Sequence, residues 1–209
     1  CKIEPGDEVI MPTFTFVSTA NAFILHGAKI KFVDSRIDHP GIDESKIEEI
    51  ITEKTKVIVV VHYGGVACDM KKIVDIAKRY NLLVIEDAAH ALGSRYSDGS
   101  LVGNCKYSDA TVFSLHPVKI IAAGEGGIIT TNNLDTYKKL LSLRSHGIVK
   151  DESLYKSKIA KTGKLINPWY YEIQEPGYHY RLTDIQSSLA ISQLRKIDHF
   201  VKKRNLLAK

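Results

Sequence analysis

The stretch LVIEDAAH, residues 83–90, runs from an apolar strand pattern directly into two acidic residues and a histidine. Nearly continuous runs of Val, Ile and Leu recur along the chain and are typical of strands buried on both faces. Predicted strands alternate with predicted helices, which indicates an α/β fold with a mostly parallel sheet flanked by helices on both faces. The predicted strands are Glu8–Met11, Lys29–Val33, Lys56–Val61, Leu82–Glu86, Ala110–Ser114 and Gly127–Thr131, and the helices between them are Phe16–His26, Glu44–Thr52 (with Asp43 as N-cap), Met70–Tyr80 and Leu134–Ser145.

Composition excludes several classes of protein. The 209 residues are 44% hydrophobic and 25% charged, with 14 Gly and 6 Pro, so collagen-like, low-complexity and disordered chains are excluded. No stretch approaches the ~20 apolar residues of a membrane span, and we expect no membrane partner. The three cysteines are scattered, which indicates a reducing cytoplasm. The eight histidines form no metal-binding motif, and we predict no metal site.

The net charge of +5 is unevenly distributed. Residues 1–105 carry 12 basic and 15 acidic groups, and residues 106–209 carry 17 and 9. Three interpretations stay open: a solvated surface, an anionic ligand such as a nucleotide diphosphate, or nucleic acid. No basic motif interleaved with aromatic residues supports the last, so we expect no nucleic-acid partner.

The sequence changes character after Gly147. Residues 148–180 are polar and aromatic without a clear period, and a segment this long is typical of a functional loop or one that covers a partner. Thr183 and Gln186 then match the N-cap and N3 positions of a capping box, which predicts the start of a long helix. Its predicted buried stripe consists of Ile185, Leu189, Ile191, Leu194, Ile197, Phe200 and Val201.

Two predicted strands are followed by residues that could bind or react with a ligand. In parallel sheets, ligands bind at the carboxyl ends of strands. Asp87 follows one strand, where a carboxylate either caps the next turn or faces a cationic ligand nitrogen. Lys119 follows a later strand and precedes the apolar run IIAA, residues 120–123. A surface lysine is the simpler interpretation, but apolar surroundings disfavour the charged amine and leave it able to attack a carbonyl.

A carboxylate at one strand end and a reactive lysine at a later one are what pyridoxal phosphate requires. The lysine holds the cofactor's aldehyde, and the carboxylate keeps the ring nitrogen protonated so that the ring can withdraw electrons. Together, Asp87 and Lys119 therefore predict a pyridoxal 5'-phosphate site.

Five motifs follow one another along the chain: EDAAHALGS (86–94), FSLHPVK (113–119), GEGG (124–127), LRSHG (143–147) and YRLTDIQ (180–186). Together they resemble the DegT/DnrJ/EryC1/StrS aminotransferases over essentially the whole chain. These fold-type I enzymes use pyridoxal phosphate and act on nucleotide-linked keto sugars. Two further tracts, residues 114–119 and 169–172, are most similar to the subgroup that aminates UDP-linked 4-keto-6-deoxy-N-acetylhexosamines in pseudaminic acid synthesis, the UDP-4-amino-4,6-dideoxy-N-acetyl-altrosamine transaminases.

The resemblance implies roles for single residues. Lys119 matches the lysine that binds the cofactor covalently, and Asp87 matches the partner of its ring nitrogen. His90 would lie near the cofactor's phenolic oxygen, and Ser114 would contact its phosphate. Phe16 would stack on one face of the ring and Ala89 would lie on the other, although Phe16 also fits a core aromatic. His62 and Tyr63 fit a substrate pocket and, equally, an ordinary strand end.

The resemblance also implies partners and domains. The enzyme would be a homodimer that takes its amino group from L-glutamate and transfers it to C4 of the sugar, with Lys119 shuttling the proton. Where His179 stands, the family usually has an Asn that reaches the neighbouring subunit's cofactor phosphate. Residues 1–209 would be a large cofactor-binding domain without the family's N-terminal phosphate-binding turn and C-terminal small domain.

Two other functions remain open. One is a non-catalytic regulatory relative that keeps the fold and binds pyridoxal phosphate. The other is a sugar dehydratase of the same family, in which a His replaces the lysine, and Lys119 disfavours it.

Overall fold

The computed structural model describes residues 1–157 and 168–208. The chain forms two compact units, one of Cys1–Asn132 with Asp184–Lys209 and one of Asn133–Thr183. Among the described residues, no helix is both long and apolar enough to span a bilayer.

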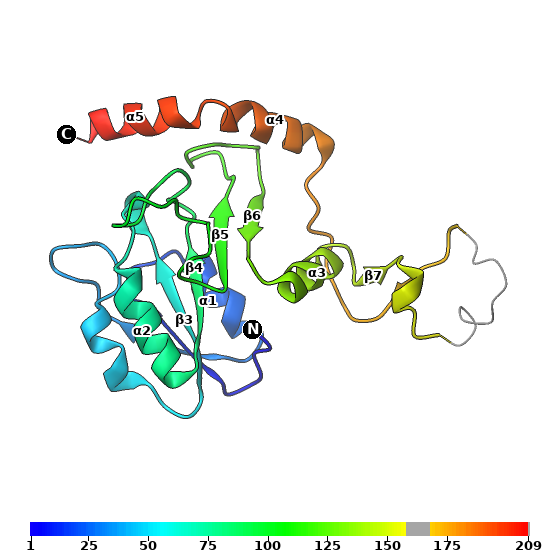
Figure 1. The fold of residues 1–209 in the computed structure, drawn as a ribbon, viewed down its shortest axis with the longest axis horizontal. Coiled ribbons are helices and arrows are strands. Elements are labelled where there is room, and N and C mark those ends of the chain that lie inside the picture. The colour runs from blue at the N-terminus through cyan, green and yellow to red at the C-terminus, as the bar shows by residue number, and fades with distance from the viewer. Residues whose placement is uncertain (158–167, 209) are drawn as a thin grey trace. The chain divides into compact units, whose positions relative to one another are not determined.

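The first unit is built on a six-stranded sheet of order β2-β1-β3-β4-β5-β6 (Figure 1). The first five strands in this order pair in parallel, and β6 runs antiparallel to β5. The predicted mostly parallel α/β fold is therefore confirmed. The strands are β1 Glu8–Pro12, β2 Lys29–Val33, β3 Thr55–Val61, β4 Leu83–Asp87, β5 Ala110–Ser114 and β6 Gly127–Thr130.

Helices α1 (Val17–Ile24) and α2 (Met70–Tyr80) cover opposite faces of this sheet. Side chains alternate between faces along a strand. Val57 and Val59 of β3 pack with Ala20 of α1, whereas Ile58 packs with Ile73 of α2. Both faces are thus apolar, which explains the continuous hydrophobic runs in the sequence. The bounds of α2 are those predicted, and Asn81 ends the helix in the left-handed conformation (φ 54°).

The predicted helix Glu44–Thr52 is wrong. Two short 3-10 turns, Glu44–Lys46 and Glu48–Ile50, take its place, and Asp43 accepts a hydrogen bond from Ser45 N as the predicted N-cap. Residues three apart share a face in a 3-10 turn. Glu44 and Ile47 are both buried at this spacing. The buried carboxylate of Glu44 is paired with Arg36 and Lys72.

The single long helix predicted after Thr183 is two helices, α4 (Asp184–Leu194) and α5 (Ile197–Leu207). In Figure 1 they run one after the other beyond the end of β5. The predicted buried stripe is also wrong: no described residue of α4 is buried, and Ile185 is 84% exposed. The apolar side chains of α5 do pack, since Val201 and Ile197 lie against Gly93 in the loop after β4.

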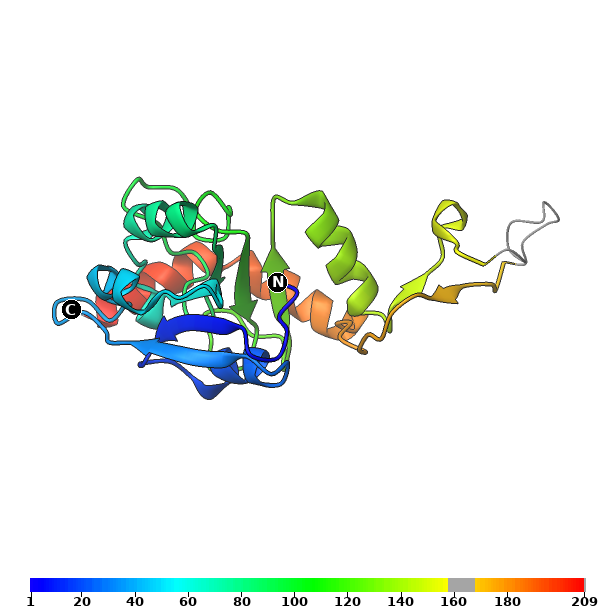
Figure 2. The same ribbon diagram turned by 90° about the horizontal axis from the view of Figure 1, so that it is seen from below.

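The second unit contains α3 (Leu134–Leu143) and a short antiparallel ribbon of β7 (Ile148–Val149) and β8 (Glu172–Ile173), which Figure 2 shows. The side chain of Asn133 caps α3 by accepting from Thr136 N. The segment predicted to be irregular, 148–180, therefore holds two short strands and a 3-10 turn at Glu152–Leu154. Residues 158–167 of that segment lie outside the described part of the chain.

Candidate active site

The carboxyl ends of β3, β4 and β5 form the edge on which the predicted site residues lie. Asp87 is the last residue of β4, and it pairs with Val61 of β3 and Val112 of β5. The next residue after β3, His62, donates its backbone N–H to Asp87 O at 3.0 Å. Ser114 ends β5 on the same edge. Parallel pairing thus brings together residues that are 25 or more positions apart in sequence.

The Asp87 carboxylate is held by two donors. Thr19 Oγ1 of α1 donates to Asp87 Oδ2 at 2.6 Å, and Ala89 N donates to Oδ1 at 3.1 Å. Thr19 is buried, and its hydroxyl also lies 2.7 Å from Thr15 Oγ1. A carboxylate fixed in this way cannot turn freely toward solvent. Sequence reasoning missed Thr19, because nothing in the sequence relates it to a residue 68 positions away.

Lys119 lies in a loop that is anchored on both sides. Leu115, Ile121 and Ala123 are buried, and Leu115 accepts a backbone hydrogen bond from Ala123. Ser114 Oγ accepts from His116 N at 3.2 Å, which shapes the turn that leads to the lysine. Lys119 itself is half-buried, so its amine reaches a surface while its backbone is fixed.

The charges of both predicted catalytic groups, Asp87 and Lys119, affect the pKa of His90. Burial lowers the pKa of the His90 imidazole, the ammonium of Lys119 lowers it further, and the Asp87 carboxylate opposes both effects. Electrostatic influence of this kind requires the three groups to be near one another. His90 Nδ1 accepts a hydrogen bond from Gly64 N at 3.3 Å, which leaves Nε2 to carry the ring proton.

Aromatic side chains stand beside these groups. Phe16 directly precedes α1 and is 73% exposed, so the alternative of a core aromatic is excluded. Tyr63 lies between two rings, with centroid distances of 4.2 Å to Phe14 and 5.2 Å to His90. Ala89 is half-buried next to Asp87. Phe16, Tyr63 and Ala89 are thus available to a ligand at this edge.

His62 differs from the other predicted site residues, because it has no exposed surface. Its Nε2 lies 2.6 Å from Glu86 Oε2, and its Nδ1 accepts from Cys68 N at 3.2 Å. Both ring nitrogens are therefore occupied inside the core. The structure favours the strand-end interpretation of His62 over contact with a substrate.

His179 belongs to the second unit. It pairs with Ser145 in an isolated β-bridge, and its ring lies 5.4 Å from that of His146. Arg181 Nη2 lies 2.8 Å from His179 Nε2, so the guanidinium donates to that nitrogen. The proton of the ring is then on Nδ1, which remains able to donate to an anion.

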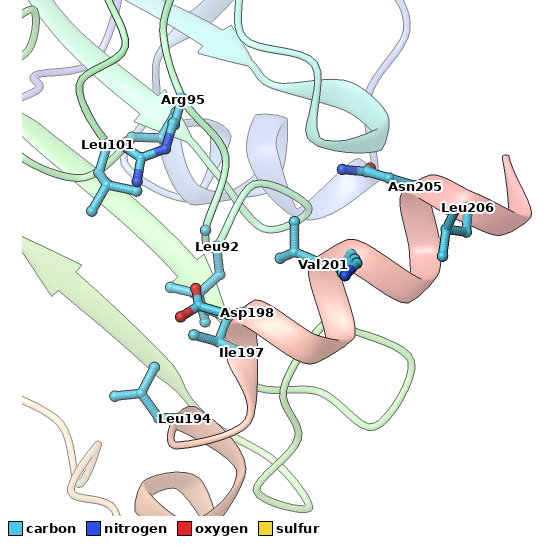
Figure 3. Close-up of a pocket in the computed structure, with 12 residues that line it drawn as sticks. Leu92, Arg95, Leu101, Leu194, Ile197, Asp198, Val201, Asn205 and Leu206 are labelled. Carbon is cyan, nitrogen blue, oxygen red and sulfur yellow. The ribbon is translucent and has the colours of Figure 1, made fainter. Parts of the chain in front are cut away.

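Two pockets flank α5. One, of about 620 Å³, lies between α5 and the loop after β4 and is mostly apolar, with Arg95 and Asp198 at its wall (Figure 3). None of the predicted site residues lines it. The other, of about 450 Å³, is lined by Lys119 together with Lys203 and Arg204 of α5. Arg204 Nη2 also donates to Lys119 O at 3.2 Å, so α5 contacts the loop of the lysine directly.

The groups at the strand edge fit the expected cofactor. A fixed carboxylate suits a protonated ring nitrogen, a half-buried lysine suits an aldehyde, and an exposed aromatic suits a flat ring. Among the described residues, no group of three or more His, Cys, Asp or Glu side chains could hold a metal ion. The fixed carboxylate, the lysine and the exposed aromatic are what fit pyridoxal phosphate, and Asp87, Lys119, His90 and Ser114 are the residues that would hold it.

Known proteins with similar sequences include two relatives about twice as long. The chain is 44% identical over 209 residues to the uncharacterized protein MJ1066 of Methanocaldococcus jannaschii, covering all of this chain and 51% of the relative. It is 40% identical over 202 residues to the UDP-4-amino-4,6-dideoxy-N-acetyl-beta-L-altrosamine transaminase of Campylobacter jejuni, covering 95% of this chain and 49% of that enzyme. The chain thus spans about half the length of these curated relatives.

A solved structure agrees with the sequence comparison. The putative sugar aminotransferase Spr1654 of Streptococcus pneumoniae, in its PMP-form, superposes with a TM-score of 0.84 at 32% identity, covering 99% of this chain and 54% of that one. The match to the family itself extends over residues 1–209. This chain therefore belongs to the DegT/DnrJ/EryC1/StrS aminotransferase family.

Proposed function

We propose that this chain is the cofactor-binding part of a pyridoxal-phosphate-dependent aminotransferase that acts on nucleotide-linked 4-keto-6-deoxy sugars. The observation that supports the proposal is that β4, which ends at Asp87, and β5, which leads to Lys119, pair in parallel, so the segments that carry Asp87, His90 and Lys119 leave the same edge of the sheet. Family membership supports the same activity.

Each side chain has a chemical task in this proposal. When bound, pyridoxal phosphate supplies an electron-withdrawing ring that accepts and passes on an amino group. Asp87, held by Thr19 and Ala89, keeps a proton on the ring nitrogen. Lys119 Nζ would move the proton to and from the reacting carbon, acting as the general base. Ser114 would donate its hydroxyl hydrogen to the phosphate.

The amino donor would be L-glutamate and the acceptor a UDP-linked 4-keto-6-deoxy-N-acetylhexosamine. The printed name of the Campylobacter relative supports the UDP-linked sugar. Tyr63, half-buried between Phe14 and His90, is the side chain that we assign to the substrate side of the site.

The active form would be a homodimer in the cytoplasm. In a dimer, His179 would donate its Nδ1 hydrogen to the cofactor phosphate of the neighbouring subunit, and residues 148–180 would belong to the contact. The free Cys1, Cys68 and Cys105 agree with a reducing compartment.

The test uses the purified full-length protein that carries this chain. Its visible spectrum with pyridoxal phosphate is recorded before and after L-glutamate is added. The proposal expects an absorbance band that glutamate removes and that is absent in Lys119→Ala. A band that does not respond to glutamate would contradict aminotransfer and favour a non-catalytic regulatory protein.

The substrate is tested in a second step. Turnover is compared on UDP-linked and GDP-linked 4-keto sugars, with a faster reaction expected for the UDP-linked one. Accumulation of a dehydrated sugar without transfer of nitrogen would instead favour the dehydratase, which Lys119 disfavours.

A further inference from the structure

Glu86, the neighbour of Asp87 in sequence, lies on the other face of the sheet. Val84 packs with the α2-side core and Ile85 with the α1-side core, so alternation places Glu86 on the α2 side. Asp87 then lies on the α1 side, as its bond with Thr19 of α1 requires. Glu86 has no exposed surface.

Four side-chain donors from four segments surround the Glu86 carboxylate. His62 Nε2 and Tyr96 Oη each lie 2.6 Å from Oε2. Thr111 Oγ1 of β5 donates to Oε1 at 2.9 Å, and Ser108 Oγ donates to the same oxygen. A buried carboxylate with this many donors is stabilised in its ionised form. Burial alone would raise the pKa of Glu86, but the bond from His62 and those from Ser108 and Tyr96 lower it.

The protonation of His62 decides the net charge of the pair. Burial disfavours the charged form of His62 and lowers its pKa, whereas its bonds with Cys68 and Glu86 act in the opposite direction. The Cys68 backbone N–H, however, points at Nδ1, which must offer a lone pair. The Cys68 thiol donates to Val61 O, so it acts as a neutral thiol and gives His62 no negative charge to bind. The geometry is therefore that of a neutral ring with its proton on Nε2.

The other polar groups around the carboxylate are neutral. Tyr96 and Thr111 donate as hydroxyls, and burial with the bond to Glu86 raises the pKa of Tyr96, which keeps its phenol protonated. Cys105 Sγ lies behind Thr111, 3.6 Å from its hydroxyl oxygen. Among the residues that the structure describes, one negative charge is thus left uncompensated directly behind the strand end that carries Asp87.

We propose that Glu86 is a positioning residue that ties β3, β4 and β5 together at the active-site edge and places one uncompensated negative charge behind Asp87. The link to the site is short: His62 binds Glu86 through its ring and Asp87 through its backbone N–H. A fixed negative charge stabilises protonated groups nearby. The consequence for the cofactor rests on the proposed function, but the charge of the pair does not.

The first experiment needs no cofactor. Histidine side chains of the full-length protein are labelled with ¹⁵N, and the His62 signal is assigned by its absence in His62→Gln. We expect a neutral ring protonated on Nε2 at pH 7. A doubly protonated ring would overturn the proposal, because the pair would then carry no net charge.

The second experiment measures the pH at which the visible absorbance of the bound cofactor changes. In Glu86→Gln we expect this midpoint to fall by about one pH unit, roughly tenfold in proton affinity. An unchanged midpoint in a folded variant would contradict the proposal. If the unmodified protein shows no cofactor absorbance, the proposed function fails, and the ¹⁵N measurement still decides whether a positive charge on His62 neutralises Glu86.

Glu44→Gln is the matched control. Glu44 is also a buried carboxylate, but its partners are Arg36 and Lys72, each at 2.7 Å. We expect this variant to unfold at a lower temperature and to keep the midpoint of the unmodified protein. A shift as large as that of Glu86→Gln would mean that loss of stability alone moves the midpoint, which would overturn the proposal.

Discussion

The two faces of the central sheet are built differently. The α2 face has a continuous core that runs from Ile10 through Ile58 to Ile73, and it completely encloses the polar side chains of His62 and Glu86. The α1 face has a smaller core around Val57 and Val59. Beside α1, the large aromatic Phe16 is exposed and a carboxylate is held at the strand end.

Because of this difference, the adjacent carboxylates Glu86 and Asp87 have different surroundings on the two faces of the sheet. The Glu86 carboxylate accepts hydrogen bonds from four side chains inside the protein, so its oxygens are not available to a ligand. Asp87 has two donors from the protein, and a carboxylate accepts about four hydrogen bonds. The α2 face thus satisfies its buried carboxylate within the protein, whereas the carboxylate beside α1 can still accept hydrogen bonds from a ligand.

The strongest test of this division is Asp87→Asn. The amide keeps the shape of the side chain but loses the charge that would hold a proton on the cofactor ring. We expect kcat to fall about 100- to 10,000-fold, with the cofactor still bound and the melting temperature nearly unchanged. Turnover with glutamate and thermal unfolding give the two readings, and a fully active variant would refute the assigned role.

Ile58→Ala tests the opposite face. Ile58 is fully buried in the α2-side core, so truncation leaves a cavity and lowers the free energy of unfolding by about 2–5 kcal/mol. Denaturant unfolding measures the loss. Phe16→Ala is the matched control, because its side chain is 73% exposed and should change stability by less than about 0.5 kcal/mol. Equal losses in the two variants would contradict the division.

Thr19→Val tests the link between α1 and Asp87. The substitution keeps the size of the side chain and removes the hydroxyl that donates to Asp87 Oδ2. We expect kcat/KM to fall about tenfold, the equivalent of about 1.4 kcal/mol for a hydrogen bond to a charged group. Thr19→Ser, which keeps the hydroxyl, should recover most of the activity. A Ser variant as slow as Val would show that packing, and not the hydrogen bond, is responsible.

The smallest effect concerns His90 and pH. Because the pKa of His90 is lowered, the folded protein binds this proton less readily than the unfolded chain. Its contribution to stability is therefore complete above about pH 6.5 and is lost as the pH falls further. The loss should be below about 1 kcal/mol, since His90 is only half-buried. Urea unfolding between pH 5 and 8 should show a weaker acid dependence in His90→Gln, and an identical dependence would contradict this assignment.

Sequence reasoning located the sheet because strands covered on both faces are apolar throughout. Lys29–Val33 and Ala110–Ser114 were predicted with the bounds that the structure has, and α2 likewise. The site edge followed from topology, since the carboxyl ends of parallel strands meet. The strands that lead to Asp87 and Lys119 end at this edge, and the role of the two side chains stays a prediction.

Other features depend on contacts that the sequence does not display. Thr19 meets Asp87 only after α1 has packed on the sheet. The burial of His62 depends on Glu86 and Cys68, which no periodicity links to it. The apolar residues of α4, such as Ile185, predict a face suited to contact but do not identify the surface that would cover it.

The central claim is that Lys119 binds pyridoxal phosphate covalently, and chemical trapping of the cofactor tests it directly. The full-length protein is incubated with pyridoxal phosphate, treated with borohydride to fix the group to the lysine that carries it, and digested for peptide mass spectrometry. We predict the added mass on the peptide that contains Lys119 and no labelled peptide from Lys119→Ala. Labelling of another lysine, with Lys119 unmodified, would contradict the account.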